Sequence, residues 1–393
     1  MPHLDATSLP ADWPAGAYAA RAMTPDGPLV LALLDGAAFD MTPAFGTVSR
    51  WLNEADPVAA IRGRGVASAF DVPAALANSA EDSCDPVLPW LLAPVDLQAV
   101  KASGVTYARS MLERVIEERC RGDASRAAAV RDEVRGIIGD DLAAVRPGSA
   151  AAMRLKDALV AKGWWSQYLE VGIGPMAEIF TKCPPMAAVG TGAKVGVHPD
   201  SHWSNPEPEV VLAVATYGGL RGAMLGNDVN LRDVEGRSAL LLGRAKDNNA
   251  ACALGPLLRL FGAGFTLDDV RQATLRLTIE GRDGFRLDET GEVGSISRDP
   301  EELVGQLIGP HHQYPDGVVL FLGTPFSPAK DRLLPGGAPG QGFTHRTGDV
   351  VRIATPRLGA LVNQVDRTDA CPPWRFGAGA LFESLARRGL PRG

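Results

Sequence analysis

The sequence lacks the features that mark several broad classes of protein. No run of apolar residues approaches the roughly 20 that a membrane-spanning helix needs. The first residues, Met1-Pro2-His3-Leu4-Asp5, lack the charged and apolar regions of a secretory signal. There is no basic stripe, and the formal net charge is −7, so nucleic acid is not indicated as a partner. We therefore expect a cytoplasmic protein that binds neither a membrane nor nucleic acid.

Cysteine is also scarce. The chain has five cysteines, an odd number, and none has C-x-x-C spacing; they are Cys84, Cys120, Cys183, Cys252 and Cys371. This pattern excludes a disulfide framework and a cysteine-based zinc site, and it favours reduced thiols. What the chain does have is length: 393 residues, of which 46% are hydrophobic, are enough for a large core and more than one domain.

Composition and periodicity divide the chain into three predicted parts: an amino-terminal accessory domain over residues 1–92, a helical linker or lid region over 93–164, and a catalytic domain over 165–393. In the first part, the apolar run 29–34 before Asp35-Gly36 predicts a strand and a turn. The third part has short strand-like runs separated by Gly, Pro, Asn and Asp, which indicates a β-rich roll.

The middle part has the spacing of helices. Val130, Val134, Ile137 and Ile138 recur at i, i+4, i+7 and i+8, and Gly139 is a plausible stop. A second helix is predicted to begin after Ser149, whose side chain suits an N-cap, and to end at Gly163.

The most informative segment is Asn205-Pro206-Glu207-Pro208-Glu209, which runs into the apolar residues 210–214. Residues i and i+2 of a strand share a face, so Glu207 and Glu209 place two carboxylates side by side at the start of a buried strand. Asp228 can return on an antiparallel neighbour and supply a third carboxylate. Three carboxylates without nearby Cys or His favour Mg²⁺, then Mn²⁺ or Ca²⁺.

These residues belong to an ordered set of motifs: Glu178-Ile179-Phe180-Thr181-Lys182-Cys183-Pro184, the Glu207-Pro208-Glu209 strand, Gly226-Asn227-Asp228, Lys246, Gly323-Thr324-Pro325 and Gly348-Asp349-Val350-Val351. Together they resemble the fumarylacetoacetate hydrolase superfamily over about residues 165–370. The resemblance implies a mixed α/β, β-rich roll that forms a homodimer or a higher homo-oligomer. It implies that Glu207, Glu209 and Asp228 bind the metal. It also implies that a 2-oxo acid substrate contacts a set of side chains comprising Lys246, Thr324, Lys182, Asn248, Ser103 and Thr106.

One departure from the family pattern concerns water activation. Hydrolases of the family carry a His–Glu pair on a helical lid, and the matching stretch here, 104–113, has Ser110 in place of the histidine and retains Glu113. Serine cannot act as a base near neutral pH without a partner that takes its proton.

Other departures resemble the branch of the superfamily that dehydrates 2-keto-3-deoxy sugar acids, the pentonates above all. They are the segment 201–209, Asn248-Asn249 after Lys246, and His311-His312 before the 318–322 strand. The resemblance implies a Mg²⁺-dependent hydro-lyase of sugar-acid catabolism that yields the semialdehyde of 2-oxoglutarate.

Three functions stay open at this point: the dehydratase, a hydrolase of 1,3-diketo acids such as acylpyruvates, and a binding protein for 2-oxo acids. A dehydratase needs a base near C3 and an acid near the C4 hydroxyl. Glu113, Lys246 and His312 are the candidates: Glu113 if closure of the lid raises its pKa, and Lys246 if burial beside the cation lowers its own. The sequence does not separate them.

Overall fold

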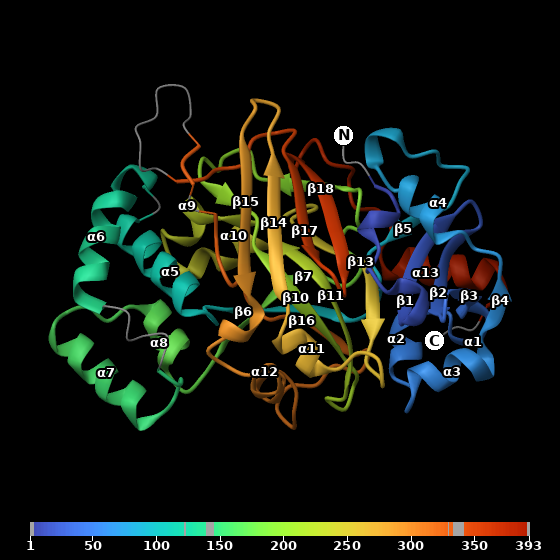
Figure 1. Cartoon of the computed structure of the whole chain (residues 1–393), viewed down its shortest axis with the longest axis horizontal. Helices are drawn as coiled ribbons and strands as arrows, with labels where there is room; N and C mark the ends of the chain where they lie inside the picture. Colours follow the sequence, from blue (N-terminus) through green and yellow to red (C-terminus); the bar gives the residue numbers. More distant parts are fainter. Residues whose placement is uncertain (1–3, 122, 139–144, 329, 333–341, 391–393) are drawn as a thin grey trace.

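The computed structural model describes residues 4–121, 123–138, 145–328, 330–332 and 342–390. Within these residues the fold is mixed α/β and rich in sheet (Figure 1). The largest sheet has eleven strands: β4 (Val66–Ser68), β3 (Ala37–Asp40), β2 (Gly27–Leu34), β1 (Ala17–Thr24), β13 (Cys252–Leu260), β11 (Leu220–Asp228), β10 (Pro208–Val214), β16 (Val318–Phe321), β6 (Ala99–Gly104) and β7 (Glu178–Cys183) in spatial order, with β5 (Trp90–Leu92) paired to β1.

A second sheet packs against the middle of the first. Its strands, in spatial order, are β15 (Arg286–Glu292), β14 (Thr274–Glu280), β17 (Val350–Thr355), β18 (Gly359–Arg367) and β8 (Lys194–Val197). Apolar side chains from the facing strands form one core between the two sheets, including Leu212, Leu225, Leu277 and Ile353, all buried. A short pair, β9 (Ser204–Asn205) with β12 (Asn230–Leu231), stands beside β10 and β11.

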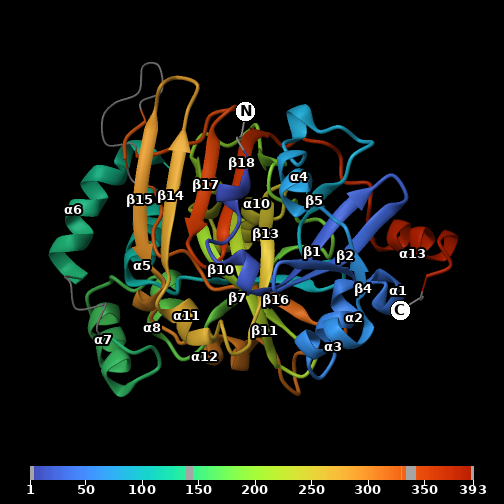
Figure 2. The ribbon, with the colours of Figure 1, turned by 45° about the vertical axis from the view of Figure 1, so that its right-hand side comes forward.

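The helices cover the edges of this arrangement (Figure 2). They are α1 (Thr42–Phe45), α2 (Val48–Leu52), α3 (Pro57–Arg64), α4 (Val72–Ala77), α5 (Ala108–Cys120), α6 (Ala127–Ile138), α7 (Ala150–Ala161), α8 (Gln167–Ile173), α9 (Arg232–Glu235), α10 (Leu242–Lys246), α11 (Leu267–Arg271), α12 (Pro300–Leu307) and α13 (Ala378–Arg387). Among the described residues, no helix combines the length and the apolar character that a membrane span requires.

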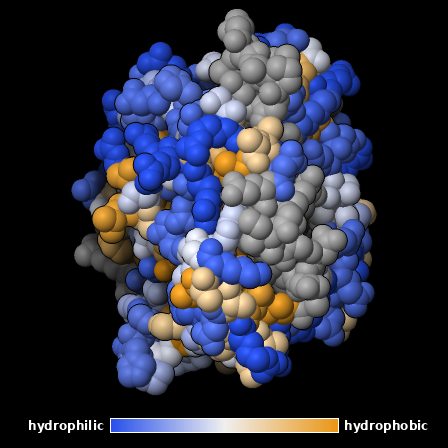
Figure 3. Space-filling model, turned by 90° about the vertical axis from the view of Figure 1, so that its left-hand side faces the viewer, coloured by the Kyte–Doolittle hydropathy of each residue, from blue (hydrophilic) through white to orange (hydrophobic). Residues whose placement is uncertain are grey.

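We call α5 to α8 the helical arm. These four helices lie together at one end of the molecule (Figure 1), and α5 packs on α6 and α8 around a core of their own. The side of the molecule that carries the arm is mostly hydrophilic where it is described, with hydrophobic residues in separate groups (Figure 3). The arm is therefore an attached unit with its own core, and the extended sheets lie beside it.

Several local predictions are confirmed. The run 29–34 lies in β2, and Asp35 and Gly36 both have positive φ, 51° and 78°, as a tight hairpin to β3 requires. Ser149 caps α7 by accepting a hydrogen bond from the Ala152 amide at 3.2 Å. The helix predicted around Val130 is α6, while its predicted stop at Gly139 lies outside the described residues.

The three-part division of the chain stays a prediction. Its first boundary falls where β5 ends, but the sheet continues across it, because β1 pairs with β13. The amino-terminal strands therefore extend the same sheet that carries the acidic residues.

Gly226, on β11, provides a test of how closely this sheet is packed. A Cβ atom at Gly226 would lie 2.3 Å from the Phe321 ring and 2.6 Å from a Val211 methyl. We expect Gly226→Ala to lower the free energy of unfolding by about 1–3 kcal/mol, the usual effect of overpacking a core, as measured by urea denaturation. Gly305→Ala, in α12 with open space around it, is the matched control. Equal stability of the two variants would contradict the packing described here.

Candidate active site

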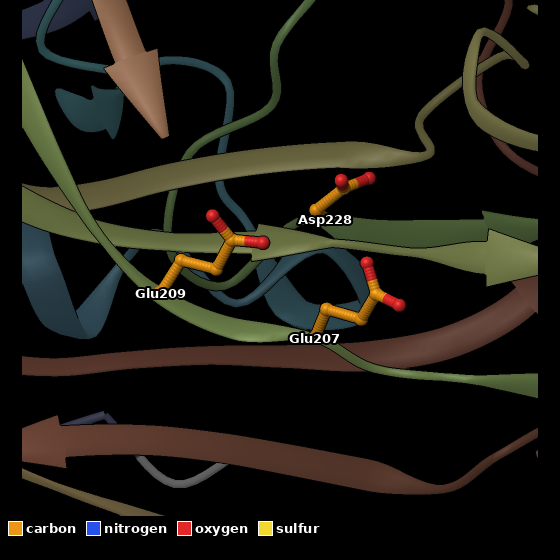
Figure 4. Close-up of side chains that lie close together, drawn as sticks. All are labelled: Glu207, Glu209 and Asp228. Carbon is orange, nitrogen blue, oxygen red and sulfur yellow. The ribbon is translucent and has the colours of Figure 1, made fainter. Parts of the chain in front are cut away.

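Three carboxylates converge where β10 and β11 lie side by side (Figure 4). Glu207 immediately precedes β10, Glu209 lies within it, and Asp228 is the last residue of β11. The antiparallel register pairs Glu209 with Gly226 and Pro208 with Asn227, which brings Asp228 beside both glutamates. One oxygen from each of the three lies within 4.8 Å of the others, and all three residues are buried. The predicted antiparallel return of Asp228 is confirmed.

The triad, as we call Glu207, Glu209 and Asp228, lines a cavity of about 20 Å³. The other lining residues are Ser103, Gly104, Val105, Arg114, Glu178, Phe180, Glu235, Lys246, Gly323 and Thr324. Of the predicted substrate contacts, Ser103, Lys246 and Thr324 are therefore in the cavity wall. Arg114, Glu178 and Glu235 were not predicted.

Two lysines neutralise part of the triad. Lys246 Nζ lies 2.5 Å from Glu207 Oε2 and 3.0 Å from Asp228 Oδ2, and Lys182 Nζ lies 2.7 Å from Asp228 Oδ1. Burial alone would lower the pKa of Lys246, but the charges of Asp228 and Glu207 outweigh it and raise that pKa above its ordinary value. The protein's own carboxylates thus favour the ammonium form of Lys246, and its role as a base beside a bound cation stays a prediction.

Beyond the triad, ion pairs form a continuous network of five carboxylates and five cations. Its carboxylates are Glu113, Glu117, Glu207, Asp228 and Glu235, and its cations are Arg114, Arg131, Lys182, Arg232 and Lys246. The network is thus electrically balanced. Among the described residues, Glu209 and Glu178 line the same cavity and have no ion-pair partner.

Those two carboxylates show the electrostatic effect of lacking a partner. Burial, with the nearby charges of Asp228 and Glu207, raises the pKa of Glu209 well above its usual value, although its Oε2 accepts a hydrogen bond from the Gly323 amide at 2.7 Å. Burial, with the charge of Glu235, raises the pKa of Glu178 to about 7. Glu209, one of the three converging ligands, and the neighbouring Glu178 thus lack a compensating ion pair, and this arrangement fits a single divalent cation.

Glu178 could have been found from the sequence. It opens the motif 178–184, and β7 confirms that this segment is a strand. Because a strand has a period of two residues, Glu178, Phe180 and Lys182 share a face, and Lys182 contacts Asp228. For Arg114 the signal is weaker: Glu117 follows it at i+3 on α5, which an exposed ion pair would show equally well.

Lys182 contacts Asp228 but does not line the cavity, and four other predicted residues do not line it either. Glu113 is held by Arg131 and Arg232 at 2.9 and 3.1 Å. Burial would raise the pKa of Glu113, but these arginines outweigh it and lower that pKa, contrary to the expectation for a closed lid. His312 is exposed, and Asn248 donates a hydrogen bond to the Arg244 carbonyl at 2.9 Å on the surface.

The fourth, Thr106, supports the site from behind. Its Oγ1 donates a hydrogen bond to the Leu322 carbonyl at 2.6 Å. The next residue, Gly323, has a φ of +91°, and a Cβ atom there would lie 2.0 Å from Thr106 Oγ1. Thr106 thereby holds the turn whose amide binds Glu209.

Comparison with known proteins agrees with this geometry. Residues 174–366 match the family described as fumarylacetoacetate (FAA) hydrolase C-terminal. This part of the chain belongs to the FAA hydrolase family. It contains the triad, both lysines, Glu178 and the Gly323-Thr324 turn, whereas Arg114 and the rest of α5 lie before it.

Two curated relatives are dehydratases. The chain is 30% identical over 195 residues to 2-dehydro-3-deoxy-D-arabinonate dehydratase of Saccharolobus solfataricus, which covers 48% of this chain and 59% of that protein. It is 31% identical over 199 residues to the probable 2-keto-3-deoxyxylonate dehydratase of Haloferax volcanii. That match covers 50% of this chain and 63% of the relative. The matched region thus spans about three fifths of each relative.

Solved structures share the fold over a longer region. The apo form of 2-keto-3-deoxy-D-arabinonate dehydratase superimposes with a TM-score of 0.61 at 20% identity, covering 89% of this chain and 98% of that one. The same enzyme complexed with magnesium and 2,5-dioxopentanoate gives a TM-score of 0.59 at 21% identity, with the same coverage of both chains. A fumarylacetoacetate hydrolase from Exiguobacterium antarcticum gives a TM-score of 0.52 at 16% identity, and the match covers 89% of this chain and 99% of that one. The FAA hydrolase fold is therefore shared by dehydratases and hydrolases.

The raised pKa of Glu178 predicts how stability changes with pH when no cation is present. Between its ordinary value of 4.5 and about 7, Glu178 binds more protons in the folded than in the unfolded chain. Folding stability therefore falls as pH rises through this range. We expect Glu178→Gln to flatten the decline in the urea midpoint between about pH 5 and about pH 8, measured in EDTA. A variant curve parallel to that of the unaltered protein would show that Glu178 has its ordinary pKa.

Proposed function

We propose that this protein is a Mg²⁺-dependent dehydratase that converts a 2-keto-3-deoxy-pentonate to the semialdehyde of 2-oxoglutarate. The observation that carries the proposal is Glu178: a partly buried carboxylate in the same cavity as the triad, without an ion-pair partner among the described residues and with a pKa of about 7. A group with this pKa can both accept and return a proton at neutral pH. The names of the two curated relatives support the same reaction.

The triad supplies only oxygen ligands, which suit Mg²⁺ and also admit Mn²⁺ or Ca²⁺. A divalent cation bound there would polarise the 2-oxo group of the substrate and so acidify the protons on C3. Lys246 and Lys182 form ion pairs with Glu207 and Asp228, and the two side chains would favour binding of the anionic substrate.

Glu178 is then the proton-transfer group. As a carboxylate it removes a proton from C3, and as a carboxylic acid it protonates the C4 hydroxyl, which leaves as water. The unsaturated alcohol that remains rearranges to the aldehyde. The substrate loses one water, and its carbon chain stays whole.

A C–C hydrolase of the acylpyruvate type needs a base that activates water instead. Within the described residues, no histidine lines the cavity, and Glu113 is held as a carboxylate outside it. The cavity, as far as it is described, therefore lacks the His–Glu pair by which hydrolases of the family activate water, and this favours the dehydratase. By resemblance to the family we further propose that the protein is cytoplasmic and forms a homodimer. Sedimentation of the purified protein tests the dimer directly.

We expect the purified protein with Mg²⁺ to convert 2-keto-3-deoxy-pentonate to a product lighter by one water, and to leave an acylpyruvate intact, as shown by mass spectrometry. EDTA should abolish the reaction, and added Mg²⁺ should restore it. Glu209→Gln should abolish it at any Mg²⁺ concentration, because the amide removes a ligand charge. Cleavage of the acylpyruvate, with no change in the sugar acid, would refute the dehydratase.

The two candidate glutamates can be separated by the same substitution at each. We expect Glu178→Gln to lower kcat by about 10²- to 10⁴-fold, the usual contribution of a general acid–base group, with a smaller effect on KM. Glu113→Gln should lower kcat far less, because Glu113 lies outside the cavity. If Glu113→Gln had the larger effect on kcat, Glu113 would be the proton-transfer group in place of Glu178.

A further inference from the structure

One buried arginine connects the helical arm to the triad. Arg114, on α5, is 6% exposed, and its guanidinium contacts three carboxylates. It lies 2.7 Å from Glu117 of the same helix and 2.7 Å from Glu235 of α9, and it also contacts Glu207 Oε1. Among the described residues, Arg114 is the one cavity-lining residue that α5 to α8 contribute.

The contacts of Arg114 continue into both neighbouring elements. Glu117 also contacts Arg232 Nε at 2.7 Å, and Arg232 begins α9, four residues after Asp228. The Arg232 guanidinium packs over the Trp203 ring at 4.4 Å from its centroid. The same helix α5 therefore reaches the strand end that carries Glu207 and the segment that follows Asp228.

The cavity is too small for the proposed substrate. A volume of about 20 Å³ accommodates about one water molecule, whereas a five-carbon acid is several times larger. Part of the wall must therefore move when substrate enters. The triad side of the wall is fixed, because β10 and β11 pair with strands on both sides. The arm helices pack chiefly on one another, and Val105 and Trp203 are the buried members of their core from outside the arm, so we take the arm as the part of the wall that moves.

We propose that Arg114 is a positioning residue that couples docking of the helical arm to cation binding at Glu207. With the arm docked, the guanidinium fixes the Glu207 carboxylate through Oε1. With the arm displaced, Glu207 loses this partner and can rotate. A cation should therefore bind more tightly when the arm is docked, and by linkage the bound cation should stabilise the docked arm by the same factor. This inference rests on the cation site of the proposed function.

An alternative effect of Arg114 is simple repulsion, since its positive charge lies next to a ligand of the cation. The two effects have opposite consequences. Arg114→Met removes the charge, so repulsion alone predicts tighter cation binding in this variant. Arg114→Lys keeps the charge but loses the planar fork that spans several carboxylates, so repulsion alone predicts no change. Positioning predicts weaker binding in both variants.

The test measures Mg²⁺ binding by the full chain with isothermal titration calorimetry, and backbone hydrogen exchange of α5 and α8 with and without Mg²⁺. We expect about 10-fold weaker Mg²⁺ binding in Arg114→Lys, the usual effect of losing a partner of a metal ligand. In the unaltered protein, Mg²⁺ should slow exchange in α5 and α8, and Arg114→Lys should lose that response. Arg154→Met, an exposed arginine of α7, is the matched control and should behave as the unaltered protein.

If Arg114→Lys fails to fold, Glu117→Gln provides a second route, because Glu117 orients Arg114 without lining the cavity. Mg²⁺ binding without any change in arm exchange, or unchanged binding in Arg114→Lys and Glu117→Gln, would overturn the coupling and leave the proposed function intact. No Mg²⁺ binding by the unaltered protein would overturn both.

Discussion

The structure depends on the burial of many carboxylates in one place. Taking a charge out of water costs several kcal/mol unless partners replace the lost hydration. Here five buried or partly buried carboxylates are matched by five cations in one network, and Glu209 and Glu178 are left over. Such a site is poorly balanced without a further positive charge. Protons can supply that charge, as the raised pKa values of Glu209 and Glu178 indicate, and so can a divalent cation, which is the ion that the proposed chemistry uses.

Local backbone features make this concentration of charge possible. The antiparallel pairing of β10 and β11 brings Asp228 beside the two glutamates without a long loop. Gly226 leaves room for the Phe321 ring beneath them, and the left-handed conformation of Gly323 directs its amide at Glu209. Thr106 holds that turn from the other side. Two glycines and a threonine that take no part in the chemistry thus determine where the carboxylates lie.

The sequence predicted the parts of the site that depend on short-range patterns. The spacing of Glu207 and Glu209, and the return to Asp228, follow from strand geometry and are reproduced in the structure. The network could not be predicted, because Arg114 and Arg232 are far apart in sequence and share the Glu117 carboxylate only through the packing of α5 on α9. The expected directions of the pKa shifts of Lys246 and Glu113 differ from those in the structure for the same reason. Burial lowers the pKa of a lysine and raises that of a glutamate, but the partners of Lys246 and Glu113 reverse both effects.

The contrast between Glu113 and Glu178 also bears on the reaction. Both are partly buried glutamates near the triad. Arg131 and Arg232 keep Glu113 ionised, whereas Glu178 forms no ion pair within the part of the chain that the structure describes. A carboxylate held by two arginines cannot be protonated easily and so cannot return a proton to a leaving hydroxyl. Glu178 can do so near neutral pH. Hydrolysis requires a base that activates water, whereas dehydration requires one group that takes a proton from carbon and delivers one to oxygen. A single glutamate beside the triad, without an ion-pair partner among the described residues, meets the second requirement. The cavity, as far as it is described, lacks the His–Glu pair by which hydrolases of the family activate water.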